Sequence, residues 1–385
     1  MPIQDLMNVT GEPWLDRFFV NPRYRHGAYG PREAAVLDEE GYGSSIAHIR
    51  EWQGYRPTPL RRLDGLAARI GVASLHYKDE GGRFGLGSFK ALGGAYAVQR
   101  LVEEHGSGIT VTCATDGNHG RSVAWGAKRF GCRCVIYIHK HVSSGRQQAI
   151  EAFGAEVRRV DGNYDESVRQ AAADANREGW TVVSDTSYPG YTEIPKLVMQ
   201  GYGVMIEEAL DGMSEPPTHI FIQGGVGGLA AAACFRSWVR YGADRPKLVI
   251  VEPVLADCIL ATALAGKLAT VEIEEETIMA GLSCGEPSLL AFEVLDEGTA
   301  AFMSVPDSAA AECMRLLAGG VDGDDPVTAG ESAVAGLAGV MALMSEPEKA
   351  ARIDLGPTSR VLLFGSEGAT DPALYEQIVG HPPRT

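Results

Sequence analysis

Short apolar runs rich in β-branched residues alternate along this chain with longer segments in which apolar residues recur every three or four positions. This alternation is typical of parallel α/β sheets, in which a covering helix follows each strand. The runs are almost continuously apolar, as expected for strands buried on both faces. The expected strands are 74–78, 108–115, 132–138, 156–160, 180–185, 219–223, 247–252 and 360–365. Helical spacing is clear at 120–131, 164–179 and 229–242, and each of these segments ends in a glycine suited to a left-handed cap.

The length of 385 residues predicts two domains. The net charge is −16 and no basic tract is present, so we expect no nucleic-acid partner. The first 18 residues lack the basic and apolar segments of a secretory signal, and the apolar run 332–344 is too short to span a bilayer. We therefore expect a cytoplasmic protein without a membrane partner.

Seven cysteines are scattered through the chain. Cys132 and Cys134 precede His139 and His141, and a metal site built from these side chains is one interpretation. Buried, reduced thiols are the interpretation that we favour, so we expect no metal.

The turns that follow parallel strands are where a ligand site is expected. The first unusual turn is "QGGVGGLAA", in which open amides at a helix start would cradle a phosphate group. The same turn, with Ala230 and Glu252, also fits a dinucleotide-binding fingerprint. A close-packed turn without a ligand is a third interpretation. The cradle residues are Gly224, Gly225, Val226, Gly227 and Gly228.

The second turn, "ATDGNHGRS" at 114–122, gathers two glycines, an acid, an amide and an imidazole. Its amides are expected to bind a substrate carboxylate, and its acid to act as a base. The alternative is an ordinary turn in which the acid and the amide cap the following helix. The candidate residues are Thr115, Asp116, Gly117, Asn118 and His119.

Two further turns carry single polar groups. Asp185 follows the strand expected at 180–185 and would either face the same crevice or cap a turn. Ser366 stands between Gly365 and Gly368, where its hydroxyl would meet a ring nitrogen or serve as a turn serine.

Lys90 lies in "FGLGSFKALGGAY", between a glycine-rich turn and a helical segment. A phosphate cradle, a carboxylate-binding turn, a hydroxyl and an isolated lysine together are the parts that hold pyridoxal phosphate and an amino acid. The amine would form a Schiff base with the cofactor aldehyde. The pKa of free lysine is ~10.4, so we expect desolvation by Phe84, Leu86 and Phe89 to lower it. A lysine that merely reaches out from a helix start is the alternative.

"SFKALGGA", "TDGNHG" and "GGVGG" resemble the fold type II pyridoxal phosphate enzymes, which include the threonine and serine dehydratases and cysteine synthases. The chain is similar in particular to the diaminopropionate ammonia-lyase family over nearly its whole length. The shared motifs, in order, are "GYRPTPL" (54–60), "KDE…RFGL…FK" (78–90), "ATDGNHGR" (114–121), "PKLVMQGYG" (195–203), "VEPVLADC" (251–258), "IMAGLSCGEP" (278–287) and "AGESAV" (329–334).

The resemblance implies two domains, each with a twisted, mainly parallel sheet flanked by helices. A large cofactor-binding domain would comprise 1–89 and 202–385, with a small domain at 90–201 inserted in it. It also implies a homodimer and a role in amino-acid catabolism.

The activity implied is a pyridoxal phosphate-dependent ammonia-lyase that converts D- or L-2,3-diaminopropionate to pyruvate and ammonia. Lys90 and Asp116 would be bases on opposite faces of the substrate, and Asp185 would position the departing ammonium. Asn118 would contact the ring hydroxyl, and Tyr188 would lie near the substrate. The chain departs from the family at Tyr188, Gly87 and Ser88, so a dehydratase or β-eliminase acting on serine, threonine or 3-hydroxyaspartate-like amino acids is the alternative.

Cys258 and Cys284 both lie in motifs of this resemblance and are expected to converge near the cleft, close enough to pair. A reducing compartment favours the thiols.

Overall fold

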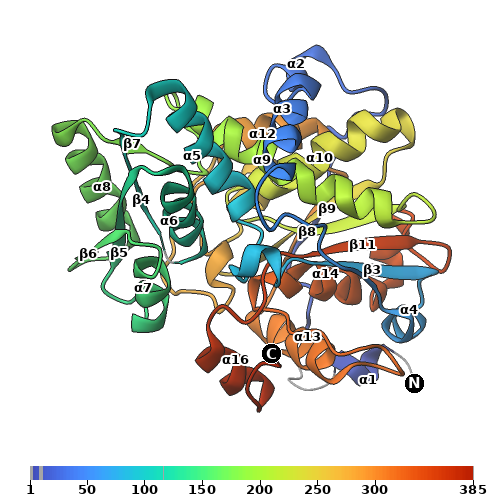
Figure 1. Cartoon of the computed structure of the whole chain (residues 1–385). Helices are drawn as coiled ribbons and strands as arrows, with labels where there is room; N and C mark the ends of the chain where they lie inside the picture. The colour runs from blue at the N-terminus through green and yellow to red at the C-terminus, as the bar shows by residue number, and fades with distance from the viewer. Residues whose placement is uncertain (1–2, 8–11, 116, 385) are drawn as a thin grey trace.

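The computed structural model describes residues 3–7, 12–115 and 117–384 (Figure 1). The larger of its two sheets has five parallel inner strands and an antiparallel strand at each edge. In spatial order these strands are β1 (Phe18–Val20), β10 (Ala301–Val305), β9 (Lys247–Pro253), β8 (His219–Gln223), β11 (Arg360–Gly365), β3 (Ser74–Asp79) and β2 (Leu60–Arg62).

The smaller sheet is built from one continuous stretch of chain between β3 and β8. Its four strands are all parallel. In spatial order they are β6 (Glu156–Val160), β5 (Arg133–His139), β4 (Thr110–Ala114) and β7 (Thr181–Val182). In the order of the chain, the strands of the smaller sheet are therefore inserted between two strands of the larger sheet.

Helices cover both faces of the larger sheet, as Figure 1 shows. Helices α9, α10 and α12 lie on one face and α4, α13 and α14 on the other. Ile220 and Ile222 of β8 belong to the core on the α9 side, whereas Phe221 between them belongs to the core that contains Leu337 of α14. Successive side chains of a strand point to opposite faces, so a strand covered on both sides must be apolar throughout.

The remaining elements connect and flank these layers. None of the described helices is long and apolar enough to cross a membrane. The helix bounds are α1 (Gln4–Met7), α2 (Pro31–Ala34), α3 (Glu39–Arg50), α4 (Asp64–Ile70), α5 (Ala91–His105), α6 (Asn118–Phe130), α7 (Ser144–Glu151), α8 (Tyr164–Glu178), α9 (Glu193–Gly212), α10 (Gly228–Tyr241), α11 (Cys258–Ala265), α12 (Leu289–Gly298), α13 (Asp307–Gly319), α14 (Ala335–Met344), α15 (Pro347–Ala351) and α16 (Pro372–Val379). Short 3₁₀ turns are η1 (Arg83–Gly85), η2 (Gly242–Asp244), η3 (Ala280–Leu282) and η4 (Ser332–Val334).

Each of the eight expected strand regions contains a strand, so the α/β prediction is confirmed. The predicted helix ends are also correct: Gly131 and Gly179 adopt left-handed caps, and Gly242 has a φ of 58°. Strands β1, β2 and β10 were not expected. The first two are edge strands of three residues each, too short to show a period, and β10 contains one β-branched residue, Val305.

Candidate active site

Lys90 and Asp185 form an ion pair between the two sheets. Lys90 immediately precedes α5, and its Nζ donates to Asp185 Oδ2 over 2.7 Å. The ammonium also lies 5.4 Å from the ring centre of Phe89 and 5.7 Å from that of Tyr202. A cation near two aromatic faces and a carboxylate is held in one orientation.

The ion pair determines the charge of the amine. Burial by itself would lower the pKa of Lys90, but the Asp185 carboxylate outweighs burial and holds this pKa above its ordinary value. Burial would raise the pKa of Asp185, and Lys90 reverses that effect, so the carboxyl has a lowered pKa. The expectation that desolvation lowers the pKa of Lys90 is therefore wrong for this state, because Asp185, expected to face the same crevice or to cap a turn, contacts the amine directly.

A buried charge network fixes the turn that leads to Lys90. Arg83 in η1 donates to Glu80 and Glu208, both over 2.7 Å. The next residue, Phe84, has a φ of 50°, which non-glycine residues rarely adopt. Its ring stacks on Trp125 of α6, with ring centres 5.1 Å apart. Packing against the smaller sheet's helix therefore stabilises the strained turn before the lysine.

The glycine loop after β8 fits a phosphate group. Gly225 and Gly227 have φ values of 59° and 98°, and the turn ends at the start of α10. A Cβ on Gly225 would make ordinary contacts with Gly281 and Leu282, the nearest at 3.5 Å, so the positive φ and not crowding is what favours glycine here. The first amides of a helix have no partner within it and attract an anion. The Asp185 carbonyl oxygen is 3.9 Å from where a Cβ of Gly228 would lie, so the cradle and the ion pair are neighbours.

Gln223 orients the hydroxyl of Ser366. Its Nε2 donates to Ser366 Oγ over 2.6 Å and to the Phe364 carbonyl over 2.9 Å. Because Ser366 Oγ already accepts one hydrogen bond, its own proton is directed elsewhere and is available to an acceptor. A neutral, unprotonated ring nitrogen is such an acceptor. The residues present therefore fit pyridoxal phosphate at both the phosphate and the ring.

The turn after β4 is held together by its own side chains. Thr115 Oγ1 accepts from the Gly117 amide over 3.0 Å, and the Thr115 amide donates to Tyr137 O. His119 lies with its Nε2 2.7 Å from Val183 O and its Nδ1 3.8 Å from Asp185. Burial lowers the pKa of His119, so this imidazole is neutral. Two of the amides expected to bind a carboxylate are thus used within the protein, and the substrate role of Thr115, Gly117 and His119 stays a prediction. Asp116 lies outside the described residues.

Asn118, the first residue of α6, reaches the larger sheet. Its Nδ2 donates to Glu367 Oε2, and Glu367 Oε1 accepts from the Ser332 amide over 3.1 Å. Glu331 lies beside Glu367. Nη2 of Arg146, a residue of α7, is 3.4 Å from Oε1 of Glu331. Burial, and then the charge of Glu367, raise the pKa of Glu331 to about 8. Two adjacent glutamates therefore connect the larger sheet to α6 and α7.

A family model described as "Pyridoxal-phosphate dependent enzyme" matches residues 51–363. Diaminopropionate ammonia-lyase of Escherichia coli strain K12 is 40% identical over 349 residues, which are 85% of this chain and 88% of that protein. The chain belongs to the diaminopropionate ammonia-lyase family.

Solved structures of this family agree with the fold. Diaminopropionate ammonia-lyase from Escherichia coli in complex with an aminoacrylate–PLP azomethine reaction intermediate has a TM-score of 0.87 and 36% identity, and covers 96% of this chain and 98% of that chain. The same enzyme in complex with D-serine has a TM-score of 0.88 at 36% identity over the same shares. The expected fold type II architecture is thereby confirmed, as is pyridoxal phosphate as the cofactor of the family.

The dinucleotide interpretation of the glycine loop is wrong. Glu252, which would have bound a ribose, is buried and accepts from the amides of Ile259 and Leu260 over 2.9 and 2.8 Å. It caps α11 and has no free oxygen facing a ligand. Burial raises the pKa of this carboxyl to about 8 although both amides oppose the shift.

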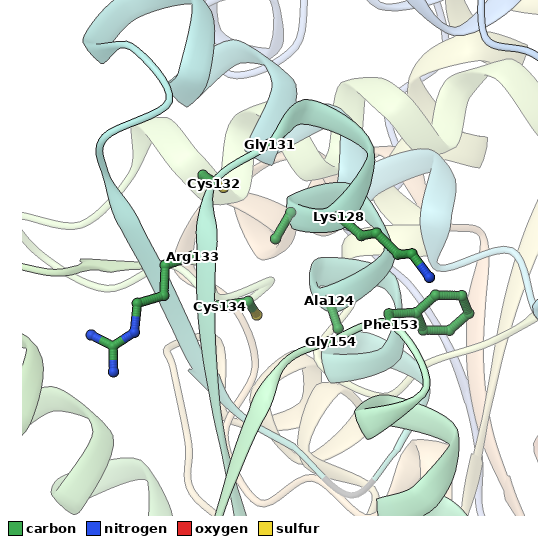
Figure 2. A pocket seen from close by; sticks show the side chains of 9 residues that line it. Ala124, Lys128, Gly131, Cys132, Arg133, Cys134, Phe153 and Gly154 are labelled. Atoms are coloured by element: carbon green, nitrogen blue, oxygen red, sulfur yellow. The ribbon is translucent and has the colours of Figure 1, made fainter.

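The cysteines near β5 line a separate pocket of about 280 Å³. Figure 2 shows Cys132 just before β5 and Cys134 on it, with Lys128 and Phe153 on one side and Arg133 pointing away. Burial raises the pKa of both thiols, which keeps them protonated and makes them poor metal ligands. Among the described residues, no three His, Cys, Asp or Glu side chains gather as a metal site would require.

Cys258 and Tyr188 are two further residues singled out from the sequence. Cys258 is a free cysteine whose thiol donates to Gly225 O over 3.6 Å, so it forms no disulfide with Cys284 in this structure. Tyr188 is 54% exposed and stacks on Tyr191, with ring centres 5.1 Å apart. Its place near the substrate stays a prediction.

Sequence reasoning missed four residues of the site. Gln223 and Glu367 directly adjoin motifs that were recognised, the glycine loop and Ser366, and buried polar residues next to such turns were the available signal. Tyr202 and Glu331 lie in the family-like segments 195–203 and 329–334, but their contacts with Lys90 and Glu367 depend on the tertiary fold.

Proposed function

We propose that this protein is a pyridoxal phosphate-dependent ammonia-lyase that converts 2,3-diaminopropionate to pyruvate and ammonia in amino-acid catabolism. The observation that carries the proposal is the Lys90–Asp185 pair beside the glycine cradle. The E. coli relatives named diaminopropionate ammonia-lyase support the substrate.

The cofactor would be held by residues of both sheets. Lys90 would bind its aldehyde carbon and the loop Gly224–Gly228 its phosphate. The Ser366 hydroxyl would face the ring nitrogen, and Asn118, held by Glu367, the ring hydroxyl. When bound, pyridoxal phosphate supplies a sink for the electron pair left on the substrate Cα.

The protein's own groups would move the protons. The Lys90 amine, once released, takes the Cα proton on one face, and Asp116 takes it from the enantiomer on the other face. Asp185 stays ionised because its pKa is lowered, so it can hold the departing β-ammonium. Loss of the β-amine gives an unsaturated amine, which water converts to pyruvate and a second ammonia.

A second candidate is β-elimination from a hydroxy amino acid. The complex of the related E. coli enzyme with D-serine favours it, because serine carries a β-hydroxyl in place of the β-amine. Removal of water from serine also yields pyruvate and ammonia, but one ammonia in place of two.

A single assay separates these functions. The purified protein is incubated with D- and L-2,3-diaminopropionate, serine, threonine and 3-hydroxyaspartate, and both keto acid and ammonia are measured. Two ammonia per pyruvate, with diaminopropionate as the preferred substrate, supports the proposal. Turnover of hydroxy amino acids alone would contradict it. Lys90→Ala is the control and should lack both turnover and an imine absorbance near ~410–420 nm.

We further propose a cytoplasmic homodimer with a large domain at 1–89 and 202–385 and a small domain at 90–201. The resemblance to the family supports the dimer. The position of β4 to β7 within residues 110–182 supports the inserted domain. Light scattering coupled to size exclusion would measure the dimer mass, and limited proteolysis would locate the boundaries.

A further inference from the structure

A large cavity opens beside the site but is lined by none of the residues assigned above to the cofactor. Its volume is about 950 Å³, and both sheets' units contribute to it. From the smaller unit come Arg121 of α6 and the start of α7. From the larger unit come the glycine-rich turn before Lys90 and the segment before α16. Figure 1 shows α7 and α16 as neighbours, and Arg146 of α7 lies 3.9 Å from Asp371.

The lining of this cavity is strongly basic, although the chain as a whole carries a net charge of −16. Two aspartates among the described lining residues face five arginines, of which Arg146 also lies 3.4 Å from Glu331. Asp79 is already paired with Arg61 over 2.7 Å, and Asp371 accepts from the Leu374 amide as the cap of α16. A local reversal of the protein's charge concentrates anions. The arginines are Arg56, Arg61, Arg121, Arg146 and Arg384.

Arg121 lines the cavity from α6. Its Nη1 is 3.7 Å from where a Cβ of Gly87 would lie, so the guanidinium reaches across to the turn before Lys90. Its Nε is buried without a hydrogen-bond partner among residues 3–7, 12–115 and 117–384. Burial lowers the pKa of Arg121, and no carboxylate in those ranges opposes that effect. A partly buried guanidinium without a counter-charge is stabilised by an anion.

The backbone around Arg121 is suited to the same ligand. The start of α7 lines the cavity at Ser143 and Gly145, and the Ser143 side chain accepts from the Arg146 amide, which leaves the earlier amides open. Side chains at Gly82, Gly85 and Gly145 would meet no atom within 4 Å, so the ligand space continues along these glycines.

We propose that this cavity is a second anion site, which binds a small phosphate-type oxyanion between Arg121 and the N-terminus of α7. A planar guanidinium and helix amides both match phosphate oxygens. The bound anion would connect α6 and α7 to the turn before Lys90. Binding there would stabilise the arrangement of the two units around the active site without entering the cofactor cradle.

The test titrates inorganic pyrophosphate into the cofactor-loaded enzyme in a low-salt buffer free of phosphate. Because the glycine cradle is then filled, saturable heat with an unchanged cofactor absorbance reports the second site. Arg121→Gln should weaken binding roughly tenfold or more, since a charge-assisted bond is lost. Arg62→Gln is the matched control, because Arg62 is exposed and paired with Asp64 outside the cavity. It should bind like the wild type.

Three results would overturn the proposal. They are the absence of saturable binding, equal binding by Arg121→Gln, and competition with the amino-acid substrate, which would place the anion in the active site. If Arg121→Gln does not fold, Arg56→Gln/Arg384→Gln tests the same cavity with two exposed arginines and should also reduce affinity. Because the test measures pyrophosphate binding, its result does not depend on which amino acid the enzyme prefers as a substrate.

Discussion

Asp185 holds the Lys90 ammonium from a position 95 residues further along the chain, with 2.7 Å between Oδ2 and Nζ. The contact joins the start of α5 to the loop after β7. It also means that the lysine is charged in this state and must lose a proton before it can act as a nucleophile.

Replacing Asp185 with Asn should destabilise the cofactor-free protein in a pH-dependent way. A lowered carboxyl pKa gives stability that is present above the unfolded value of ~3.9 and is lost as pH falls. A raised lysine pKa gives stability that is complete below ~10.4 and is lost at higher pH. Urea unfolding should therefore show a cost on the order of 1–3 kcal/mol near pH 7 that shrinks towards pH 3. A cost independent of pH would contradict the ion-pair interpretation.

Gly225→Ala should weaken cofactor binding more than it weakens folding. The φ of 59° disfavours any side chain, so an alanine would shift the loop backbone whose amides form the cradle. Gly242 is a matched control because it has a φ of 58°, open space around it, and a place at the other end of α10. Both variants should lose about 1 kcal/mol of stability from backbone strain, but Gly225→Ala alone should bind pyridoxal phosphate less tightly in equilibrium dialysis. If the two variants bound pyridoxal phosphate equally tightly, the assignment of the glycine loop as the phosphate site would be wrong.

Glu331 should make the folded protein less stable as pH rises. Its folded pKa of about 8 exceeds the unfolded value of ~4.3, so the folded state binds more protons between these pH values. Glu331→Gln should abolish part of this decline and raise stability at pH 9 by on the order of 1 kcal/mol. Denaturation midpoints at pH 6 and pH 9 measure the effect, with Glu348→Gln on the exposed face of α15 as a control. A parallel pH dependence in wild type and Glu331→Gln would show that the carboxyl is ionised throughout.

Asp116→Asn should separate the two enantiomers of the substrate. If Lys90 and Asp116 are bases on opposite faces, the variant should lose ~10²–10⁴-fold in rate on D-2,3-diaminopropionate and retain most of its rate on the L form. Initial rates of pyruvate formation on each enantiomer are the measurement. Losses of the same size on both would mean that Asp116 only shapes the carboxylate turn.

Local patterns were sufficient to predict the layers of this protein, but not the contacts between them. The strands at 156–160, 219–223 and 360–365 have the same bounds in the structure, because each is a compact run between turn signals. Lys90, the glycine loop and Ser366 were found because their chemistry depends on neighbouring residues in the chain. Glu367 and Asn118 are 249 positions apart, and no period or propensity indicates that they share a hydrogen bond. For the same reason the charge of Lys90 was mispredicted, since it is determined by a distant carboxylate.

Because β3 pairs with β11, the larger sheet can be completed only after the smaller one during synthesis. Ser74 to Asp79 lie opposite Arg360 to Gly365, near the two ends of the chain, whereas the four strands of the smaller sheet are complete once residue 182 has been made. During synthesis, the smaller sheet can form before β11 has been made. Until then, the edge of β3 that later pairs with β11 is exposed. A message cut before residue 360 would therefore yield a chain with one finished sheet and with exposed edges on both β3 and β8. Such a chain would lack Ser366 and Glu367 and would be prone to aggregation.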